Sequence, residues 1–149
     1  MSILDQLPIG SRITLYALLS TIAVFTLLVL WAQVGCIRGK SFENPDGTKD
    51  DWHEQKIFYG IAWADILVAC PVSFAALIMV FAAPRYGFYT MGLVSFWFVW
   101  ANVMTTVTSL RFEKPRITLP WIAVFPLGTV IGLAFISWTL AHFDTIYGI

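Results

Sequence analysis

Four long apolar runs divide the chain, and short polar segments separate them. The runs cover residues 13–36, 57–83, 87–110 and 117–143. Each is long enough to cross a hydrocarbon core of roughly 30 Å, which takes about 20 helical residues. Lipid offers no hydrogen-bond partner to the backbone, so each run is predicted to be a helix. The alternating segments of a transmembrane β-barrel are absent. The pattern therefore predicts an all-α fold, a single-domain antiparallel bundle of four transmembrane helices.

The connections between the runs differ in length. Residues 37–56 hold almost all the polar material of the chain and include Asn44-Pro45-Asp46-Gly47, a strong turn signal. The connections at 84–86 and 111–116 are short, and a short link forces consecutive helices to lie side by side in opposite directions. We therefore expect the second, third and fourth helices to be sequential neighbours.

The basic residues predict the orientation of the helices. Loops 37–56 and 111–116 contain Arg38, Lys40, Lys49, Lys56, Arg111, Lys114 and Arg116. The opposite side contains only Arg12 and Arg85. Because Lys and Arg are enriched in cytoplasmic loops, both loops are predicted to be cytoplasmic and both termini outside, in a multi-pass protein of the cell membrane. The N-terminus lacks the cleavage site of a signal peptide, so the first run is expected to be retained.

Composition supports a membrane class and excludes several others. Apolar residues make up 58% of the chain and charged residues 12%, whereas a soluble domain is about 25% charged. The formal net charge is zero, so no electrostatic field indicates nucleic acid as a partner. Two cysteines, Cys36 and Cys70, are too few for a disulfide framework. Their separate depths predict that they are unpaired.

A single acid, Asp65, lies inside an apolar run, in the segment IFYGIAWADILVACPVSF. It follows Ile57 by eight residues, roughly 12 Å along a helix. A carboxylate at that depth must be protonated, paired, or turned towards protein or water. Two interpretations remain open: Asp65 belongs to an ion- or ligand-binding site, or it is a neutral group that packs one helix against another.

The residues around Asp65 predict the direction in which it faces. Small or weakly polar residues recur on its side of the helix, and such a stripe is typical of close helix contacts in lipid. The stripe consists of Ala62, Asp65, Ala69, Ser73 and Ala76. Pro71 removes one backbone hydrogen bond and predicts a kink nearby. We therefore expect Asp65 to face inward, beside a bend.

The third run carries a matching polar stripe, made of Ser95, Asn102, Thr106 and Ser109, with Thr105 alongside. Asn102 lies eight residues before Leu110, so on an antiparallel neighbour it shares the depth of Asp65. The register predicts a hydrogen bond between Asp65 and Asn102. The candidate residues for binding a ligand or ion are Asp65, Asn102, Trp63, Ser73 and Thr106.

The tryptophans divide by depth. Trp31, Trp52, Trp121 and Trp138 lie near the ends of the runs, where interfacial anchoring accounts for them. Trp63 and the patch FWFVW at residues 96–100 lie deeper. The patch is expected either to line a site for a lipid tail or other flat ligand, or to pack against lipid or a neighbouring subunit.

Three small residues are predicted to serve helix packing: Gly128, Gly132 and Ala69. The two glycines form a G-x-x-x-G pattern in the fourth run, which allows two helices to approach closely. The contact lies either within the chain or between subunits. Pro126 directly before the pattern is expected to bend the helix.

The run Asp50-Asp51-Trp52-His53-Glu54 is the only dense group of side chains able to bind a metal. Asp51 and Glu54 fit a capping box at the start of the second helix. The alternative is a metal site at Asp50, His53 and Glu54. The segment does not match the EF-hand calcium-loop pattern, because Asp51 occupies the position that requires glycine. His142 is predicted to lie at the opposite end of the bundle, so it is unable to join this cluster, and the sequence identifies no cofactor.

The topology resembles that of the small glutathione-dependent membrane enzymes of eicosanoid metabolism, which have four helices and a long first cytoplasmic loop. The Arg/Asn/Glu constellation of that family is missing from IFYGIAWADILVACPVSF, so the resemblance is restricted to architecture. Three classes of function remain. The first is a non-catalytic subunit, scaffold or lipophilic-ligand-binding module, either a homo-oligomer or part of a membrane complex. The others are a small homo-oligomeric transporter or channel using Asp65, and an enzyme acting on a lipophilic substrate. The partners expected are the lipid bilayer, other subunits and a lipophilic small molecule, with no nucleic acid.

Overall fold

The computed structural model describes residues 3–40, 42–43, 49–50, 56–111 and 119–148. Within them the chain is helical apart from one two-residue ladder, and four helical stretches are long and apolar enough to cross a membrane. The first is α2 (Ile9–Ile37). The second is one continuous helix made of α3 (Lys56–Ala64), η2 (Asp65–Ala69) and α4 (Cys70–Ala82). The third and fourth are α5 (Pro84–Arg111) and α6 (Leu119–Ala141). The prediction of a helical chain with four such stretches is confirmed.

Two helix boundaries differ from the prediction. α2 begins at Ile9, four residues before the predicted start at residue 13. Pro8 occupies its N-cap, and the helix starts directly after it. Only Ala83 separates α4 from α5, where residues 84–86 were expected to form the connection. Pro84 is the first residue of α5, a position that suits proline because the N–H it lacks would have no partner within the helix.

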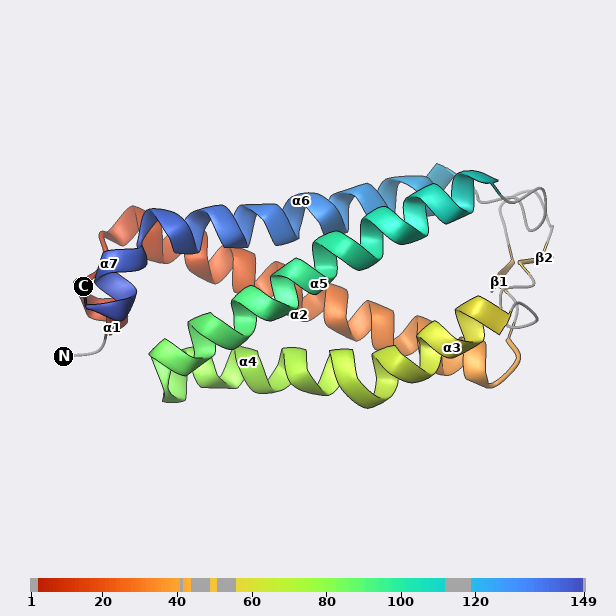
Figure 1. The fold of residues 1–149 in the computed structure, drawn as a ribbon, viewed down its shortest axis with the longest axis horizontal. Helices are drawn as coiled ribbons and strands as arrows, with labels where there is room; N and C mark the ends of the chain where they lie inside the picture. The colour runs from red at the N-terminus through yellow and green to blue at the C-terminus, as the bar shows by residue number, and fades with distance from the viewer. Residues whose placement is uncertain (1–2, 41, 44–48, 51–55, 112–118, 149) are drawn as a thin grey trace.

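Three short elements complete the described chain. α1 (Ile3–Gln6) and α7 (Phe143–Tyr147) pack against each other at the end that carries both termini, which we call the terminus end (Figure 1). In the first loop, β1 (Phe42–Glu43) pairs antiparallel with β2 (Lys49–Asp50). The turn signal Asn44–Gly47 falls between these strands and lies outside the described residues.

Successive long helices run in opposite directions, and Figure 1 shows α5 diverging from α4 with distance from the terminus end. α5 packs along both α4 and α6, while α2 packs against the α3–η2–α4 helix and against α6. The core is concentrated in the half nearer the termini. Its fully buried members include Leu15, Ile22, Val80, Phe88, Met91 and Phe135. The opposite half, at what we call the loop end, is less closely packed.

The terminus end is closed by polar and aromatic contacts between α2 and α6. The Nδ1 of His142 lies 2.8 Å from the carbonyl of Trp138, which only accepts, so Nδ1 carries the proton. In neutral His142, Nε2 then accepts from the Ser11 hydroxyl at 2.9 Å. The ring of His142 stacks on that of Trp138. Trp138 is buried and also stacks on Phe88, so its predicted role as an interfacial anchor is wrong: it belongs to the core.

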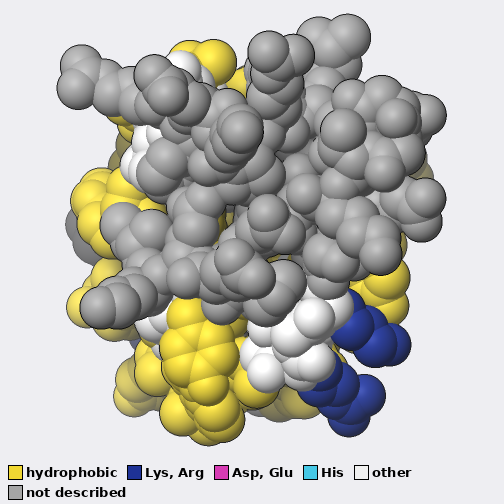
Figure 2. Space-filling view, turned by 90° about the vertical axis from the view of Figure 1, so that its right-hand side faces the viewer, with side chains coloured by type: hydrophobic (Ala, Val, Ile, Leu, Met, Phe, Trp, Pro, Cys, Tyr) yellow, Lys and Arg dark blue, Asp and Glu magenta, His cyan; other side chains and the backbone are white. Residues whose placement is uncertain are grey.

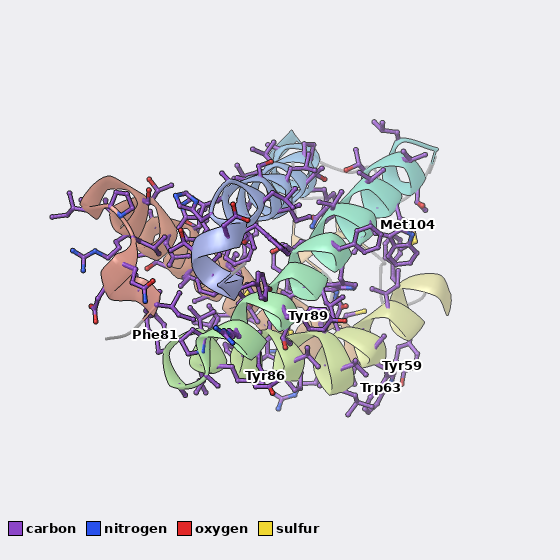
Figure 3. All side chains as sticks on the ribbon, turned by 60° about the vertical axis from the view of Figure 1, so that its left-hand side comes forward. Tyr59, Trp63, Phe81, Tyr86, Tyr89 and Met104 are labelled. Carbon is purple, nitrogen blue, oxygen red and sulfur yellow. The ribbon has the colours of Figure 1, made fainter. Side chains whose placement is uncertain are left out.

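Large apolar side chains cover the outer surfaces of the long helices. Only 22–28% of the most apolar window of each helix is buried inside the molecule. Tyr59 and Trp63, for example, extend outward from α3 (Figure 3) and are 43% and 42% exposed. A helix of a soluble protein keeps such residues to one face that packs on the core. These helices therefore present apolar surface on the sides that face away from the protein.

Basic side chains mark the loop end. Arg38 and Lys40, which follow α2, are exposed. Figure 2 views the molecule from this end and shows dark blue basic side chains beside hydrophobic ones. The exposed apolar surface of the long helices therefore gives way to charged side chains where α2 ends.

Candidate functional site

An irregular turn in the second long helix positions Asp65. Residues Asp65–Ala69 form a π-helix, in which the N–H of Cys70 bonds to the carbonyl of Asp65, five residues earlier. Pro71 follows directly and lacks the N–H that would otherwise bond to the carbonyl of Leu67. The irregularity that the sequence predicts here thus takes the form of one wide turn. Single π turns inside α-helices occur frequently at functional sites.

The predicted inward stripe is confirmed in four of its five members. Ala62, Asp65, Ser73 and Ala76 are buried, and Ala69 is partly buried. Leu67, on another face, is 64% exposed. Asp65 therefore faces the interior of the molecule, and only 6% of its surface is exposed.

Gln33 of α2 is the hydrogen-bond partner of Asp65. The amide Nε2 of Gln33 donates to Oδ2 of Asp65 at 2.7 Å. Gln33 was not among the predicted site residues, although it is the one strongly polar residue of the first apolar run. Its position four residues before the end of α2 places it roughly 6 Å from the loop end, within reach of the depth of Asp65. A search of every apolar run for amide side chains would have found it.

The predicted hydrogen bond between Asp65 and Asn102 is wrong. The Nδ2 of Asn102 donates instead to the carbonyl of Phe98, one turn back on α5, at 2.7 Å. The shared depth was estimated correctly, because both side chains line one cavity. They do not meet, because α5 leans away from the α3–η2–α4 helix towards the loop end.

The cavity lies in the less closely packed half of the molecule, between α2, α3, η2, α5 and α6, and has a volume of about 440 Å³. Its polar residues are Gln33, Asp65, Asn102 and Thr105, and the rest are apolar, four of them aromatic. The aromatic lining consists of Phe58, Trp97, Trp100 and Phe125. A second cavity of about 230 Å³ adjoins it and shares Gln33, Trp97 and Asn102, among others. We call the two together the Asp65 cavity.

The aromatic patch of residues 96–100 is divided between inside and outside. Trp97 is partly buried and Phe98 is buried, whereas Phe96 and Trp100 are more than half exposed. Trp97 and Trp100 both line the Asp65 cavity. The patch therefore contributes one wall of this cavity and also outward-facing surface.

The remaining candidate residues lie elsewhere. Trp63 extends outward and contacts Tyr59 edge-on. The Ser73 hydroxyl is fully buried and donates to the carbonyl of Ala69. The Thr106 hydroxyl donates to the carbonyl of Asn102, and its neighbour Thr105 lines the cavity instead. The structure thus brings together Asp65 and Asn102 of the predicted set, with Gln33 and Thr105 added.

The two glycines of the G-x-x-x-G pattern face α5. A Cβ atom added to Gly132 would lie 2.6 Å from the carbonyl oxygen of Ser95, and one added to Gly128 would meet the side chain of Asn102. Gly128 thus leaves room for the amide that lines the Asp65 cavity. Pro126 lies within α6, which continues through it.

Most of the polar cluster predicted as a capping box or weak metal site lies outside the described residues. This holds for Asp51, His53 and Glu54, while the backbone of Asp50 belongs to β2. Among the residues that the structure does describe, no group of three His, Cys, Asp or Glu side chains is placed to hold a metal ion. Cys36 and Cys70 are free, as predicted, and both are buried.

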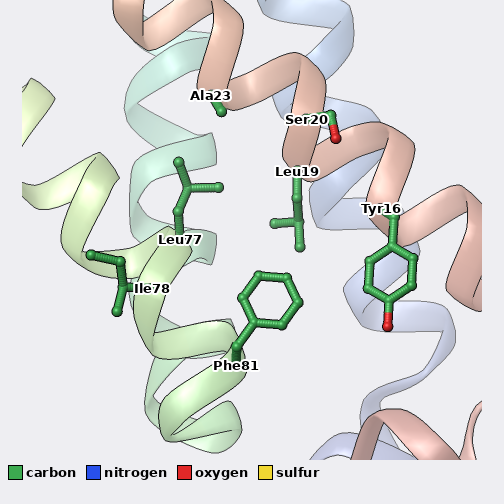
Figure 4. A pocket seen from close by; sticks show the side chains of 7 residues that line it. All are labelled: Tyr16, Leu19, Ser20, Ala23, Leu77, Ile78 and Phe81. Atoms are coloured by element: carbon green, nitrogen blue, oxygen red, sulfur yellow. The ribbon is translucent and has the colours of Figure 1, made fainter.

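A second hollow lies on the outer surface between α2 and α4, towards the terminus end. Figure 4 shows Leu19 of α2 and Leu77 and Phe81 of α4 in the space between the two helices, with Tyr16 beside them. The rings of Tyr16 and Phe81 stack at 6.2 Å. This hollow has few polar groups and contains no charged side chain, so it differs in chemistry from the Asp65 cavity.

Comparison of the chain with protein-family models, with curated proteins and with solved structures finds no match in any of the three.

Proposed function

We propose that this chain is an integral membrane protein, with its four long helices crossing the bilayer as an antiparallel bundle, and that the Asp65 cavity binds a lipophilic small molecule. The observation that carries the proposal is the lining of the cavity. A pair of hydrogen-bonded polar side chains, Asp65 and Gln33, lies in a hollow whose other walls are mostly apolar and include four aromatic side chains. Small-molecule sites have this character: mostly apolar walls with a few polar groups that orient the ligand.

Membrane insertion is supported by the exposed surface. Most of each long helix is apolar and unburied, and such area in water would lead to association. In the proposed orientation, the loop end with Arg38 and Lys40 is cytoplasmic and the termini lie outside. The Asp65 cavity then lies in the cytoplasmic half of the membrane.

The alternative, that Asp65 only packs one helix on another, accounts for less of the geometry. A packing group is enclosed by the helix that it contacts, as Ser73 is. Asp65, Gln33 and Asn102 instead border an open volume large enough for a molecule of about fifteen heavy atoms, at roughly 30 Å³ per atom. A cavity of this composition is consistent with a ligand or with ordered water.

A second candidate function is a small homo-oligomeric transporter in which Asp65 carries a cation or proton. It is favoured by the position of the acid in a cavity at membrane depth. The test is the flux of cations or protons into proteoliposomes. If Asp65→Asn abolishes this flux but retains binding, the protein is a transporter rather than a binding protein alone.

The binding function is tested with the neutral probe N-phenyl-1-naphthylamine and the protein in phosphatidylcholine nanodiscs. Ala101 lines the cavity, so Ala101→Trp should fill it and weaken saturable binding at least about tenfold, a change of 1.4 kcal/mol. Ala82→Trp is the matched control because Ala82 is exposed on α4, away from the cavity. Empty nanodiscs give the lipid background. Equal binding by wild type, Ala101→Trp and Ala82→Trp would contradict the proposal.

A further inference from the structure

The Asp65 cavity contains one acid and no base. Among the residues that line its two parts, Asp65 is the sole Asp, Glu, Lys, Arg or His. Its hydrogen-bond partner, Gln33, is neutral. In the described part of the chain, the ion pair present is that of Arg12 with Asp5, which lies at the terminus end. The carboxyl group of Asp65 therefore has no counter-ion supplied by the described chain.

The amide side chains of the cavity offer oxygens to a bound donor. The Nδ2 of Asn102 faces the carbonyl of Phe98, which only accepts, so Oδ1 is left for another donor. The Nε2 of Gln33 is engaged by Asp65, so its Oε1 is likewise available to a donor. Thr105 donates its hydroxyl proton to the carbonyl of Ala101 and retains lone pairs. Each amide also retains a second N–H, so the neutral polar groups of the lining can both donate and accept, and Asp65 supplies the charge.

The aromatic walls suit a cation. Trp97 and Trp100 line the same volume as Asp65. The face of an indole ring attracts ammonium groups, most strongly where water is excluded. A bound anion would instead meet the Asp65 carboxylate with no basic side chain among the lining residues, an arrangement that disfavours it.

We propose that the ligand of the Asp65 cavity is a lipophilic ammonium compound, whose N–H groups bond to the oxygens of Asp65, Gln33 and Asn102 and whose apolar body lies against the tryptophans. This inference rests on the proposed binding function and narrows it to one ligand class. The ligand itself supplies the missing positive charge. Fatty acids and other lipophilic anions are excluded from the cavity by the same chemistry.

Three probes of one shape test the inference: 1-naphthylmethylammonium, the neutral 1-naphthylmethanol and the anionic 1-naphthoate. Their affinities are measured on the full chain in phosphatidylcholine nanodiscs, with empty nanodiscs subtracted. Wild type should bind the ammonium at least about tenfold more tightly than the alcohol, and should not bind the naphthoate. Asp65→Asn should remove the preference for the ammonium over the alcohol. Asp144→Asn is the control, because Asp144 is an exposed acid on α7, and it should keep the preference.

The outcomes separate this inference from the proposed function. If the alcohol binds as tightly as the ammonium in wild type, or if Asp65→Asn keeps the preference, the ammonium inference is overturned. The binding function survives in that case, provided that Ala101→Trp still weakens binding of N-phenyl-1-naphthylamine. If Asp65→Asn fails to fold, Trp97→Leu replaces it and should weaken the ammonium more than the alcohol; an equal loss for both overturns the inference.

Discussion

Gly132 provides a quantitative test of how closely α5 and α6 approach each other. Replacing it with alanine adds one Cβ atom, which would lie 2.6 Å from the Ser95 carbonyl oxygen and 2.9 Å from a methyl group of Val99. The first distance is about 0.8 Å below the 3.4 Å at which ordinary contact begins. The obstructing oxygen belongs to helical backbone, so the clash is relieved only by moving one helix away from the other.

The expected cost of Gly132→Ala is that of overpacking, about 1–3 kcal/mol. Alanine also favours a helix interior over glycine by up to about 1 kcal/mol, which offsets part of this cost. Gly92→Ala isolates the clash, because Gly92 lies in α5 with nothing within 4 Å of its added Cβ. The two variants gain the same helix propensity, so their free energies of unfolding should differ by about 1–3 kcal/mol, with Gly132→Ala the less stable.

The assay is equilibrium unfolding of the protein in bicelles, titrated with sodium dodecyl sulfate and followed by circular dichroism. Gly92→Ala should equal or exceed wild type in stability. If Gly132→Ala is as stable as Gly92→Ala, then α5 and α6 do not make this close contact in the bilayer. The G-x-x-x-G pattern would then have to be explained by contacts outside the chain.

Three further predictions concern the terminus end. Gly87→Ala should destabilise the protein more than Gly132→Ala in the same titration, because its Cβ would collide with the backbone of Met79 and Val80 where α5 turns back on α4. Ser11→Ala removes the donor to His142 and should cost about 1 kcal/mol, detected as faster amide hydrogen exchange at the start of α2; unchanged exchange would argue against the contact. Burial, and to a lesser degree the neighbouring Tyr89, raises the pKa of Tyr147 above 10.0. The neutral form of Tyr147 therefore contributes stability that is present below pH 10 and is lost as the pH rises through the pKa of Tyr147 in the folded protein. In a titration followed by phenolate absorbance, one tyrosine should ionise late, and Tyr147→Phe should remove it.

The long helices could be predicted because their sequences are long, nearly unbroken apolar runs. A run of about 20 apolar residues has to satisfy its own hydrogen bonds, so the pattern alone placed all four to within a few residues. Inward-facing Asp65 was likewise predictable, since its small neighbours recur at helical spacing on one face. These inferences use only local sequence.

The partner of Asp65 could not be predicted from register, because register gives depth but not separation. Asn102 shares the depth of Asp65 and lines the same cavity, yet the divergence of α5 from the α3–η2–α4 helix leaves its amide to bond within α5. The angle between helices depends on the packing of the terminus half, where Phe88, Phe135 and Trp138 stack. Trp138 illustrates the same limit: its place near a helix end indicated the membrane interface, whereas two aromatic neighbours draw it into the core.

The wide turn at Asp65–Ala69 affects how this helix is to be aligned with distant relatives. A π turn accommodates one residue more than an α-helix of the same length, so a relative with a regular helix here would be one residue shorter. Each residue corresponds to about 100° of rotation. An alignment without a gap in this turn would therefore match either Asp65 or Pro71 with its true counterpart, but not both. A single deletion inside the turn would rotate the loop-end part of the helix away from the cavity while leaving the packed half in place.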